Sequence, residues 1–256
     1  MGAISPVVAE DQLMTTHVSI AGSIAASVWF AWASAAFGGE AAPKATGDPP
    51  ARQAELELFD GKSLGRWKVV EQFEFRRHGE VAVRDGAIVL GAGKPGTCIR
   101  YDGPVPKIDY EISLEAQRVE GEDFFCGMTF MVEDEPLSLI LGGWGGQTCG
   151  LSCIDGEPAA ENETCEFRDF ENGRWYSIRV RVTKPKIQVW VDGEKLIDFQ
   201  REDKRLSIWF EKESVTPLAI ATWRTTGAVR NLKIRPIAPP AVESPTKDRP
   251  DEDGRS

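Results

Sequence analysis

The chain has 256 residues, enough for one large domain or two small ones, and 41% of them are hydrophobic. It has 40 acidic and 30 basic residues, so its formal net charge is −10 at pH 7. Phosphate binding requires clustered Lys and Arg, and because no such cluster occurs along the chain, the composition argues against a nucleic-acid partner. The 25 Gly, 16 Pro and 8 Trp are typical of a globular protein rich in turns.

The N-terminal region has the pattern of a targeting segment. Residues 18–37 are uncharged and mostly apolar, and they contain an Ala-Ser-Ala sequence at 33–35 that suits signal-peptide cleavage. A stretch of about 20 apolar residues can instead stay in a bilayer as an anchor. We therefore expect an exported protein, periplasmic or extracellular, with residues 1–37 as a signal peptide or N-terminal anchor and 38–53 as a linker. No other membrane contact is expected.

The next part of the chain, residues 54–237, shows the alternation of half-buried strands. Apolar side chains occupy every second position in four segments, residues 110–116, 176–182, 187–192 and 206–210. No part of 54–237 keeps a helical period over three turns. The pattern predicts a domain made almost entirely of strands.

Turn signals separate these segments. Asp85-Gly86 and Asp192-Gly193 are pairs favoured in two-residue hairpins, where both residues need positive φ, and Lys184-Pro185 marks another turn. Many antiparallel strands joined by short turns predict an all-β fold, a two-sheet antiparallel β-sandwich. The remaining residues, 238–256, are rich in Pro and acidic side chains, and we expect them to form a disordered tail.

The cysteines and histidines offer few metal ligands. An oxidising compartment would leave at least one of the five cysteines unpaired. Three of them lie close together in the sequence, and a disulfide between two of the three, or simple burial of the thiols, is favoured over thiolate coordination of a metal. His78 is the only histidine after residue 37, and we expect it in a solvated turn. The cysteines are Cys98, Cys126, Cys149, Cys153 and Cys165.

The segment 141–167 is the most informative for function. Four glycines surround Trp144, so the backbone can approach a ligand closely and the indole is left unshielded. Glu161, Asn162 and Glu163 follow in a polar run. An aromatic face beside carboxylates and an amide is a common arrangement for binding a sugar ring. The alternative is a Gly-rich hairpin in which Trp144 fills the core and the carboxylates are solvated.

Three further tryptophans are candidate sugar contacts. Trp190 and Trp209 lie on the polar side of their predicted strands, and Trp223 lies beside Arg224 in the last predicted strand. Trp190 and Trp209 could equally be covered by a loop.

Several motifs resemble the 3-keto-disaccharide hydrolase family. They are Leu-Phe-Asp-Gly-Lys-Ser-Leu-Gly-Arg-Trp at 58–67, Gly-Arg-Trp-Tyr-Ser-Ile-Arg at 173–179, Val-Asp-Gly-Glu at 191–194 and the closing segment 222–232. Together they span about residues 56–234. The resemblance implies a concanavalin-like jelly roll and a lyase or hydratase acting on 3-keto-glycosides. The chain departs from the family at 126–129, where Cys-Gly-Met-Thr replaces the usual Asn-Ser-Gly strand.

The implied reaction needs an acid, a base and a group that stabilises an enolate. A ketone at C3 acidifies the proton on C2, its removal expels the group at C1, and water can then add to the double bond. Glu161 and Glu163 would share one face of a strand and serve as base and acid, with Arg224 facing the enolate. A divalent cation held by Asp155, Glu161 and Glu163 is an alternative to the arginine.

Two other functions compete with an enzyme. A non-catalytic, lectin-like carbohydrate-binding module would use the same aromatic residues without needing a titrating carboxylate. A structural or adhesion domain would bury its tryptophans in the core and have no ligand groove.

Overall fold

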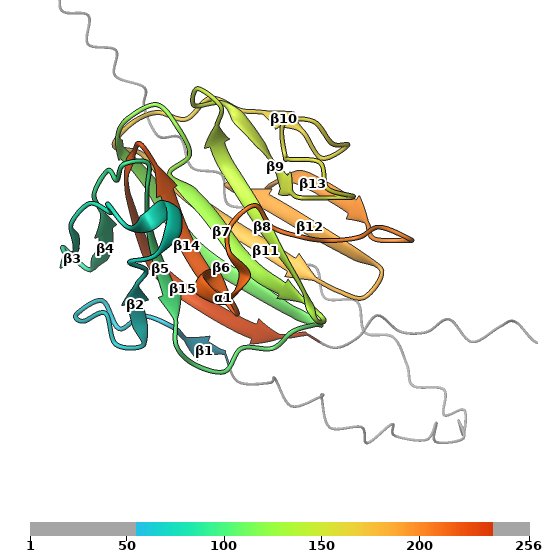
Figure 1. Cartoon of the computed structure of the whole chain (residues 1–256). Helices are drawn as coiled ribbons and strands as arrows, with labels where there is room; N and C mark the ends of the chain where they lie inside the picture. Colours follow the sequence, from blue (N-terminus) through green and yellow to red (C-terminus); the bar gives the residue numbers. More distant parts are fainter. Residues whose placement is uncertain (1–54, 238–256) are drawn as a thin grey trace, which may run out of the picture. The chain divides into compact units, whose positions relative to one another are not determined.

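The computed structural model describes residues 55–237, which form a two-layer β-sandwich (Figure 1). The expected signal peptide or anchor, linker and disordered tail lie outside the described residues, so these predictions stay untested. Within the described range, no helix combines the length and apolar character that crossing a membrane requires.

One sheet has eight antiparallel strands in the order β13-β12-β11-β6-β15-β4-β3, and β1 pairs with β15. Its strands are β1 (Leu56–Glu57), β3 (Val81–Arg84), β4 (Ala87–Leu90), β6 (Tyr110–Glu120), β11 (Trp175–Val182), β12 (Lys186–Val191), β13 (Glu194–Gln200) and β15 (Thr226–Pro236).

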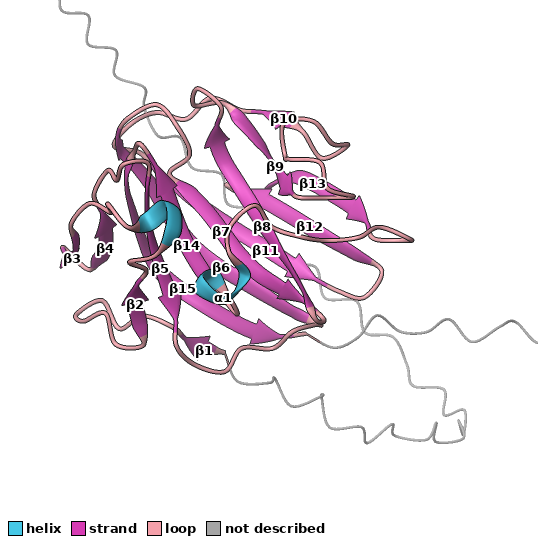
Figure 2. Cartoon of the chain, viewed as in Figure 1, coloured by secondary structure: helices cyan, strands magenta, loops and turns pink. Residues whose placement is uncertain are grey.

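The other sheet has seven antiparallel strands in the order β10-β9-β8-β7-β14-β5-β2. Its strands are β2 (Trp67–Val69), β5 (Gly96–Tyr101), β7 (Cys126–Val132), β8 (Glu135–Gly143), β9 (Thr148–Ser152), β10 (Glu166–Phe167) and β14 (Ala219–Trp223). Helical structure within 55–237 is limited to η1 (Phe73–Phe75) and α1 (Lys212–Val215), drawn in cyan in Figure 2. The predicted all-β sandwich is confirmed.

The main core lies between the two sheets and follows the predicted alternation. On β6, Tyr110, Ile112 and Leu114 are buried against the opposite sheet, and the intervening side chains face the other way. Each fully buried aliphatic side chain contributes about 1.5–3 kcal/mol to folding. Trp67 is almost completely buried in the same core, and its indole N–H donates to the Leu58 carbonyl oxygen at 2.9 Å.

The predicted hairpin turns are also confirmed. Asp85-Gly86 joins β3 to β4 and Asp192-Gly193 joins β12 to β13, with φ values of 50°, 76°, 53° and 81° in chain order. These are the left-handed conformations that a two-residue hairpin needs, and Gly adopts them without steric cost.

One predicted strand, at residues 206–210, is wrong. Leu206 forms only an isolated bridge with Ile154, and the residues after it form a loop that leads to α1. The alternating pattern has a different cause: Leu206 packs in the main core, whereas Phe210 packs against Phe75 and Trp223 at ring-centroid distances of 5.0 and 6.2 Å. Apolar alternation here reflects packing on two separate surfaces.

A second, smaller core covers part of the outer face of the seven-stranded sheet. On β8, Leu139 and Leu141 face the main core, so Ile140 between them points outward. Phe75 of η1 and Val215 of α1 belong to this second core, which anchors both helical segments on the sheet. The loop before α1 is thereby held against the outer face, where the candidate site lies.

Candidate functional site

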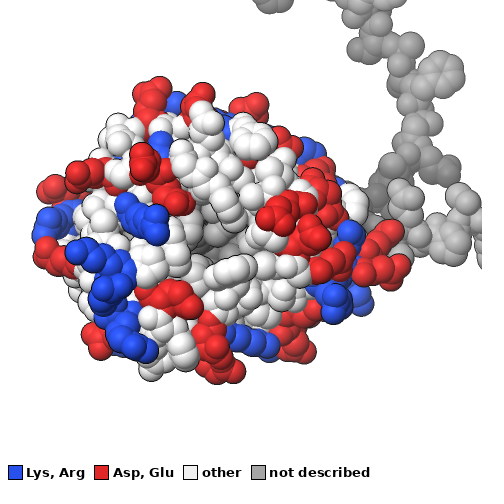
Figure 3. All heavy atoms as spheres, turned by 45° about the horizontal axis from the view of Figure 1, so that its top comes forward, with Lys and Arg blue, Asp and Glu red and all other residues white. Residues whose placement is uncertain are grey.

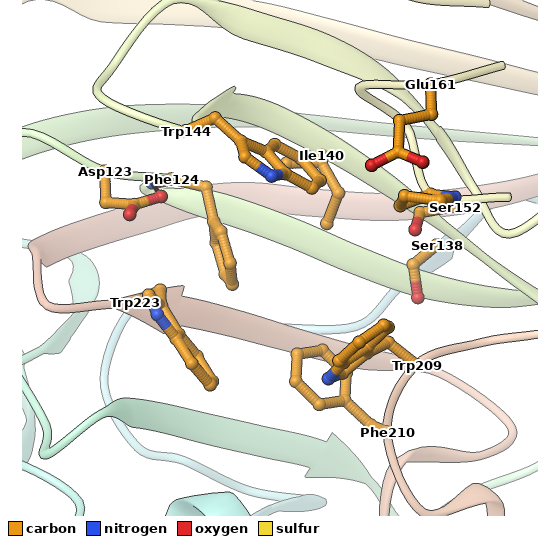
Figure 4. A pocket seen from close by; sticks show the side chains of 11 residues that line it. Asp123, Phe124, Ser138, Ile140, Trp144, Ser152, Glu161, Trp209, Phe210 and Trp223 are labelled. Atoms are coloured by element: carbon orange, nitrogen blue, oxygen red, sulfur yellow. Dashed lines mark hydrogen bonds between the residues drawn. The ribbon is translucent and has the colours of Figure 1, made fainter.

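A pocket of about 390 Å³ opens on the outer face of the seven-stranded sheet (Figure 4). It collects side chains from β8, β9 and β14, from the segment before β7, and from the loops around Trp144, Glu161 and Trp209. Its lining residues are Asp123, Phe124, Ser138, Ile140, Trp144, Ser152, Pro158, Glu161, Trp209, Phe210 and Trp223.

Hydroxyl groups form one part of the sheet surface beneath the pocket. Ser138 on β8 pairs in register with Thr129 on β7 and with Ser152 on β9, so the three side chains form a row across neighbouring strands. The hydroxyls of Thr129 and Ser138 are hydrogen-bonded at 2.8 Å. Ser138 and Ser152 line the pocket, and each can donate to or accept from a ligand oxygen.

Three of the predicted tryptophans line this pocket. Trp144 is 53% exposed and Trp209 is 72% exposed, so both present indole surface to a ligand. Trp223 is half-buried and stacks on Phe124 with a centroid distance of 6.0 Å and an interplanar angle of 25°. The alternative in which Trp144 fills the core is therefore wrong. The presence of the pocket also contradicts the ligand-free adhesion domain, for which no groove is expected.

Trp190, the fourth candidate, is not in the pocket. It lies on β12, in the other sheet, and its side chain points away from the core because Val189 and Val191 on either side are buried. The guanidinium of Arg179 lies over its ring, 3.8 Å from the centroid. Its position on the polar side of a strand thus has a structural explanation, a cation–π contact on the outer face of the eight-stranded sheet.

Asp123 is a pocket carboxylate that the sequence analysis missed. It is half-buried, and its carboxylate accepts the backbone N–H of Phe124 at 2.8 Å. Burial raises the pKa of Asp123 above the ordinary aspartate value; the two backbone donors and Arg224 oppose this shift, and Glu122 adds to it. The only sequence signal was an acidic residue placed just before an apolar strand.

The expected pairing of Glu161 and Glu163 is wrong. Residues 161–164 form turns instead of a strand, so the i, i+2 spacing does not place both carboxylates on one face. Glu161 lines the pocket, on the side opposite Asp123 (Figure 4). Glu163 lies outside the pocket, and its Oε1 forms an ion pair with Nζ of Lys204 at 2.9 Å. The hydrogen bond from Lys204 lowers the pKa of Glu163.

The three carboxylates proposed as cation ligands do not fit a metal ion. Asp155 and Glu163 both bind the ammonium group of Lys204, at 3.1 and 2.9 Å, whereas Glu161 faces the pocket. Residues 55–237 contain no cluster of three or more potential metal-ligating side chains. All five cysteines are free thiols, and four of them are buried, so burial rather than a disulfide is observed.

Asn162 and Arg224 have local roles different from those expected. The Asn162 side-chain amide donates to the carbonyl oxygens of Leu151 and Pro158 at 2.8 and 2.9 Å, so it stabilises the turn before Glu161 and does not face a ligand. Arg224 is exposed in the turn after β14 with φ of 49°, and its charge acts on Asp123 from outside the pocket lining.

The pocket is apolar with acidic groups and has no basic lining residue. In the view of Figure 3, a hollow lies among uncharged residues, and charged side chains gather toward the edges of that face. An aromatic surface with a few carboxylates and hydroxyls suits an uncharged, hydroxyl-rich ligand better than an anion.

Comparison with protein families is decisive for the assignment. Residues 55–235 match the model of the 3-keto-alpha-glucoside-1,2-lyase-like domain, which covers nearly all of the described sandwich. The chain belongs to this family. The resemblance seen in the sequence motifs is thereby confirmed, and the family is one of carbohydrate-active domains. The comparison with curated protein sequences gives no match.

The solved structures that this chain resembles are distant from it in sequence. The Crh5 transglycosylase in complex with NAG has a TM-score of 0.51 and 10% identity, covering 74% of this chain and 86% of its own. The carbohydrate-binding module CBM66 from Bacillus subtilis has a TM-score of 0.45 and 9% identity, covering 66% and 95%. Domain 4 of the extracellular arabinanase AbnA from Geobacillus stearothermophilus, in complex with arabinotriose, has a TM-score of 0.46 and 16% identity, covering 68% of this chain and 84% of its own. At 10% identity the likeness to the transglycosylase concerns the fold alone.

Proposed function

We propose that the pocket binds an uncharged 3-keto-glycoside and eliminates the group attached at C1. The observation that supports this most directly is the placement of two carboxylates, Asp123 and Glu161, on opposite sides of a tryptophan-lined pocket in a domain of this family. An elimination needs a base at one position and an acid at another, so two separated carboxylates suit it.

Substrate binding would use the aromatic and hydroxyl groups of the pocket. The exposed indoles of Trp144 and Trp209 offer flat surfaces for the C–H faces of sugar rings. Ser138 and Ser152 would hydrogen-bond the ring hydroxyls or the C3 oxygen from the sheet surface. The absence of Lys and Arg among the lining residues disfavours anionic sugars.

The proposed elimination has two steps and is followed by hydration. A carboxylate removes the C2 proton, and the C2–H electrons form a C2=C3 enolate with negative charge on the C3 oxygen. As the C3 carbonyl re-forms, the electrons shift to make a C1=C2 double bond and the C1–O bond breaks, with a proton supplied to the leaving oxygen. Addition of water, with OH at C1 and H at C2, then gives the hydrated keto-sugar.

The two carboxylates differ in environment, which suggests their roles. Because burial raises the pKa of Asp123, this group holds a proton to higher pH than an ordinary aspartate and suits the acid that protonates the leaving oxygen. Glu161 would then be the base. For Arg224 we propose an indirect role, because its charge acts on Asp123 rather than on a ligand in the pocket.

The test is turnover of 3-keto-methyl-α-glucoside by the purified full chain, followed by methanol release and by absorbance of the enone. Asp123→Asn and Glu161→Gln should each lower the rate by about 10²–10⁴-fold, the usual contribution of positioned acid–base catalysis. Glu163→Gln is the matched control, because Glu163 is bound to Lys204 outside the pocket, and it should retain the wild-type rate.

Wild-type rates in both pocket variants would refute the assignment of Asp123 and Glu161. Binding of the 3-keto-glycoside by the wild type without any turnover would replace the enzyme with a non-catalytic carbohydrate-binding module, which would use the same aromatic surfaces.

Export is a further part of the proposal, and it is supported by the uncharged apolar residues 18–37 and the Ala-Ser-Ala sequence at 33–35. Fractionation of cells producing the full chain should place the protein outside the cytoplasm, and a chain lacking residues 1–37 should stay inside. Equal distribution of the two chains would contradict export through this segment.

A further inference from the structure

Arg118, near the end of β6, is a buried cation. It is 7% exposed, and among residues 55–237 it forms no ion pair with a carboxylate. A guanidinium removed from water must have its N–H donors satisfied by other groups, and the cost of leaving them unpaired is high. The groups that satisfy Arg118 therefore show which segments it holds in place.

The donors of Arg118 reach two loops outside its own strand. Its Nη1 donates to the Gly146 carbonyl oxygen at 3.2 Å, and its Nε donates to Oδ1 of Asn172 at 2.7 Å. Its Nη2 donates to the Phe170 carbonyl oxygen. The guanidinium also lies over the Phe125 ring, 6.0 Å from the centroid. One side chain thus connects β6 to the loop before β11 and to the loop that carries Trp144.

The Trp144 loop, residues 142–147, needs such support because its backbone is in an unfavourable conformation. Gly142, Trp144, Gly145 and Gly146 have φ values of 74°, 48°, 93° and 104°. Left-handed φ is disfavoured for a bulky residue such as Trp and persists only where neighbouring contacts enforce it. The 3.1 Å hydrogen bond from the Gly146 N–H to the Gly143 carbonyl is one contact, and Arg118 supplies another.

Gly146 links Arg118 to the carboxylate of the pocket. A Cβ added at Gly146 would lie 2.9 Å from Nη1 of Arg118 and 3.1 Å from the carbonyl oxygen of Glu122, so the loop is packed between these two groups. Asp123 follows directly, and its carboxylate lies against the same loop: a Cβ added at Gly143 would be 3.9 Å from Oδ1 of Asp123, and the backbone N–H of Trp144 lowers the pKa of this carboxyl. A shift of the loop would therefore move the Trp144 indole and change the backbone environment of the Asp123 carboxylate together.

We infer that Arg118 is a positioning residue: it holds the 142–147 loop so that Trp144 presents its indole to the pocket and the loop backbone stays against the Asp123 carboxylate. Arg118 does not line the pocket, so its effect is indirect. The catalytic importance of Asp123 rests on the proposed function, whereas the coupling of Arg118 to Asp123 and Trp144 does not.

The test compares two pairs of variants. Arg118→Lys removes the forked guanidinium but keeps the charge. Arg181→Lys is its control, because Arg181 lies on the same eight-stranded sheet but binds Glu111 on the outer face, away from the pocket. Gly146→Ala disturbs the same contact without altering Arg118. Its control is Gly145→Ala, which has a similarly strained φ but no atom within 4 Å of the added Cβ.

Two quantities are measured for each variant. One is the ionisation of the Asp123 carboxyl, followed by carbon NMR and identified by its loss in Asp123→Asn. The other is affinity for 3-keto-methyl-α-glucoside, measured by calorimetry with Glu161→Gln added to every chain to prevent turnover. Arg118→Lys and Gly146→Ala should raise the pKa of Asp123 further, because the Trp144 donor lowers it, and should weaken binding about 3- to 10-fold. Arg181→Lys should behave as its parent, and Gly145→Ala should change both quantities less than Gly146→Ala, because the two share the φ strain but only Gly146→Ala presses on Arg118.

A lower melting temperature with unchanged Asp123 ionisation and affinity in both test variants would overturn the inference and leave Arg118 as a purely structural residue. If Arg118→Lys does not fold, the comparison of Gly146→Ala with Gly145→Ala still tests whether the Arg118 contact positions the loop. A shifted Asp123 in a protein that never turns over the keto-glycoside would support the role of Arg118 and reject the proposed reaction, so the two failures are distinguishable.

Discussion

Replacing Trp144 with alanine should weaken sugar binding much more than it affects folding. An indole side chain has about 250 Å² of surface, and 53% of Trp144 is exposed. A ring stacked on one face would cover roughly half of the exposed part, about 65 Å², which at about 25–45 cal/mol per Å² corresponds to about 1.6–3 kcal/mol. The dissociation constant should therefore rise by roughly 15- to 130-fold.

The measurement is calorimetric titration with 3-keto-methyl-α-glucoside in an Asp123→Asn background, so that the ligand is not consumed. Trp144→Phe keeps an aromatic ring and should lose less affinity than Trp144→Ala. Trp190→Ala is the matched control, because Trp190 also points outward from a sheet but lies on the other sheet, under the guanidinium of Arg179, and it should bind as its parent does.

Folding stability provides the second half of this test. Deleting a fully buried tryptophan such as Trp67 costs about 3–5 kcal/mol, and the loss for Trp144→Ala should be smaller because half of the indole is already solvated. Unchanged affinity combined with a loss as large as that of Trp67→Ala would refute the reasoning, since Trp144 would then act as a core residue.

Two further predictions concern pH and stability. The pKa of Asp123 is raised from 3.8 in the folded state, so its contribution to stability is complete below pH 3.8 and is lost as pH rises through the folded pKa. In urea unfolding, Asp123→Asn should therefore gain stability relative to the wild type between pH 3.5 and pH 7. A stability difference between the two proteins that does not change with pH would contradict the raised pKa. Burial would raise the pKa of Glu111, but hydrogen bonds from Arg235 and Arg181 lower it below 4.5. Glu111→Gln should cost about 1–3 kcal/mol at pH 7, and the loss should shrink as pH falls through the folded pKa of Glu111; a constant loss in urea unfolding would contradict this.

Local patterns were enough to predict the fold class. Alternation at 110–116 and 176–182 reflects strands with one buried face, and the two Asp-Gly pairs encode hairpins through backbone conformations that few residues adopt. Both signals arise from neighbours in the chain. The same reasoning failed at 206–210, where the alternation came from packing on two different surfaces.

The pocket was only partly predictable. Trp144 stood out because glycines surround it, and Glu161 because it lies in a polar run, but the spacing of Glu161 and Glu163 implied a strand that does not form. Turn geometry directs one carboxylate into the pocket and the other to Lys204. The spacing of two residues predicts whether their side chains point the same way only when both lie in one helix or strand.

The sequence by itself determined that the chain forms a β-sandwich, because strand period and turn chemistry are properties of neighbouring residues, and its motifs carried the resemblance to the family. Only the tertiary structure decided which side chains share the site. Strand order and register bring Asp123, Glu161 and Trp223 to one face although up to 100 residues separate them, and they carry Trp190 to the opposite sheet. The connection from Arg118 through Gly146 to Asp123 likewise depends on packing between distant segments, which no local pattern encodes.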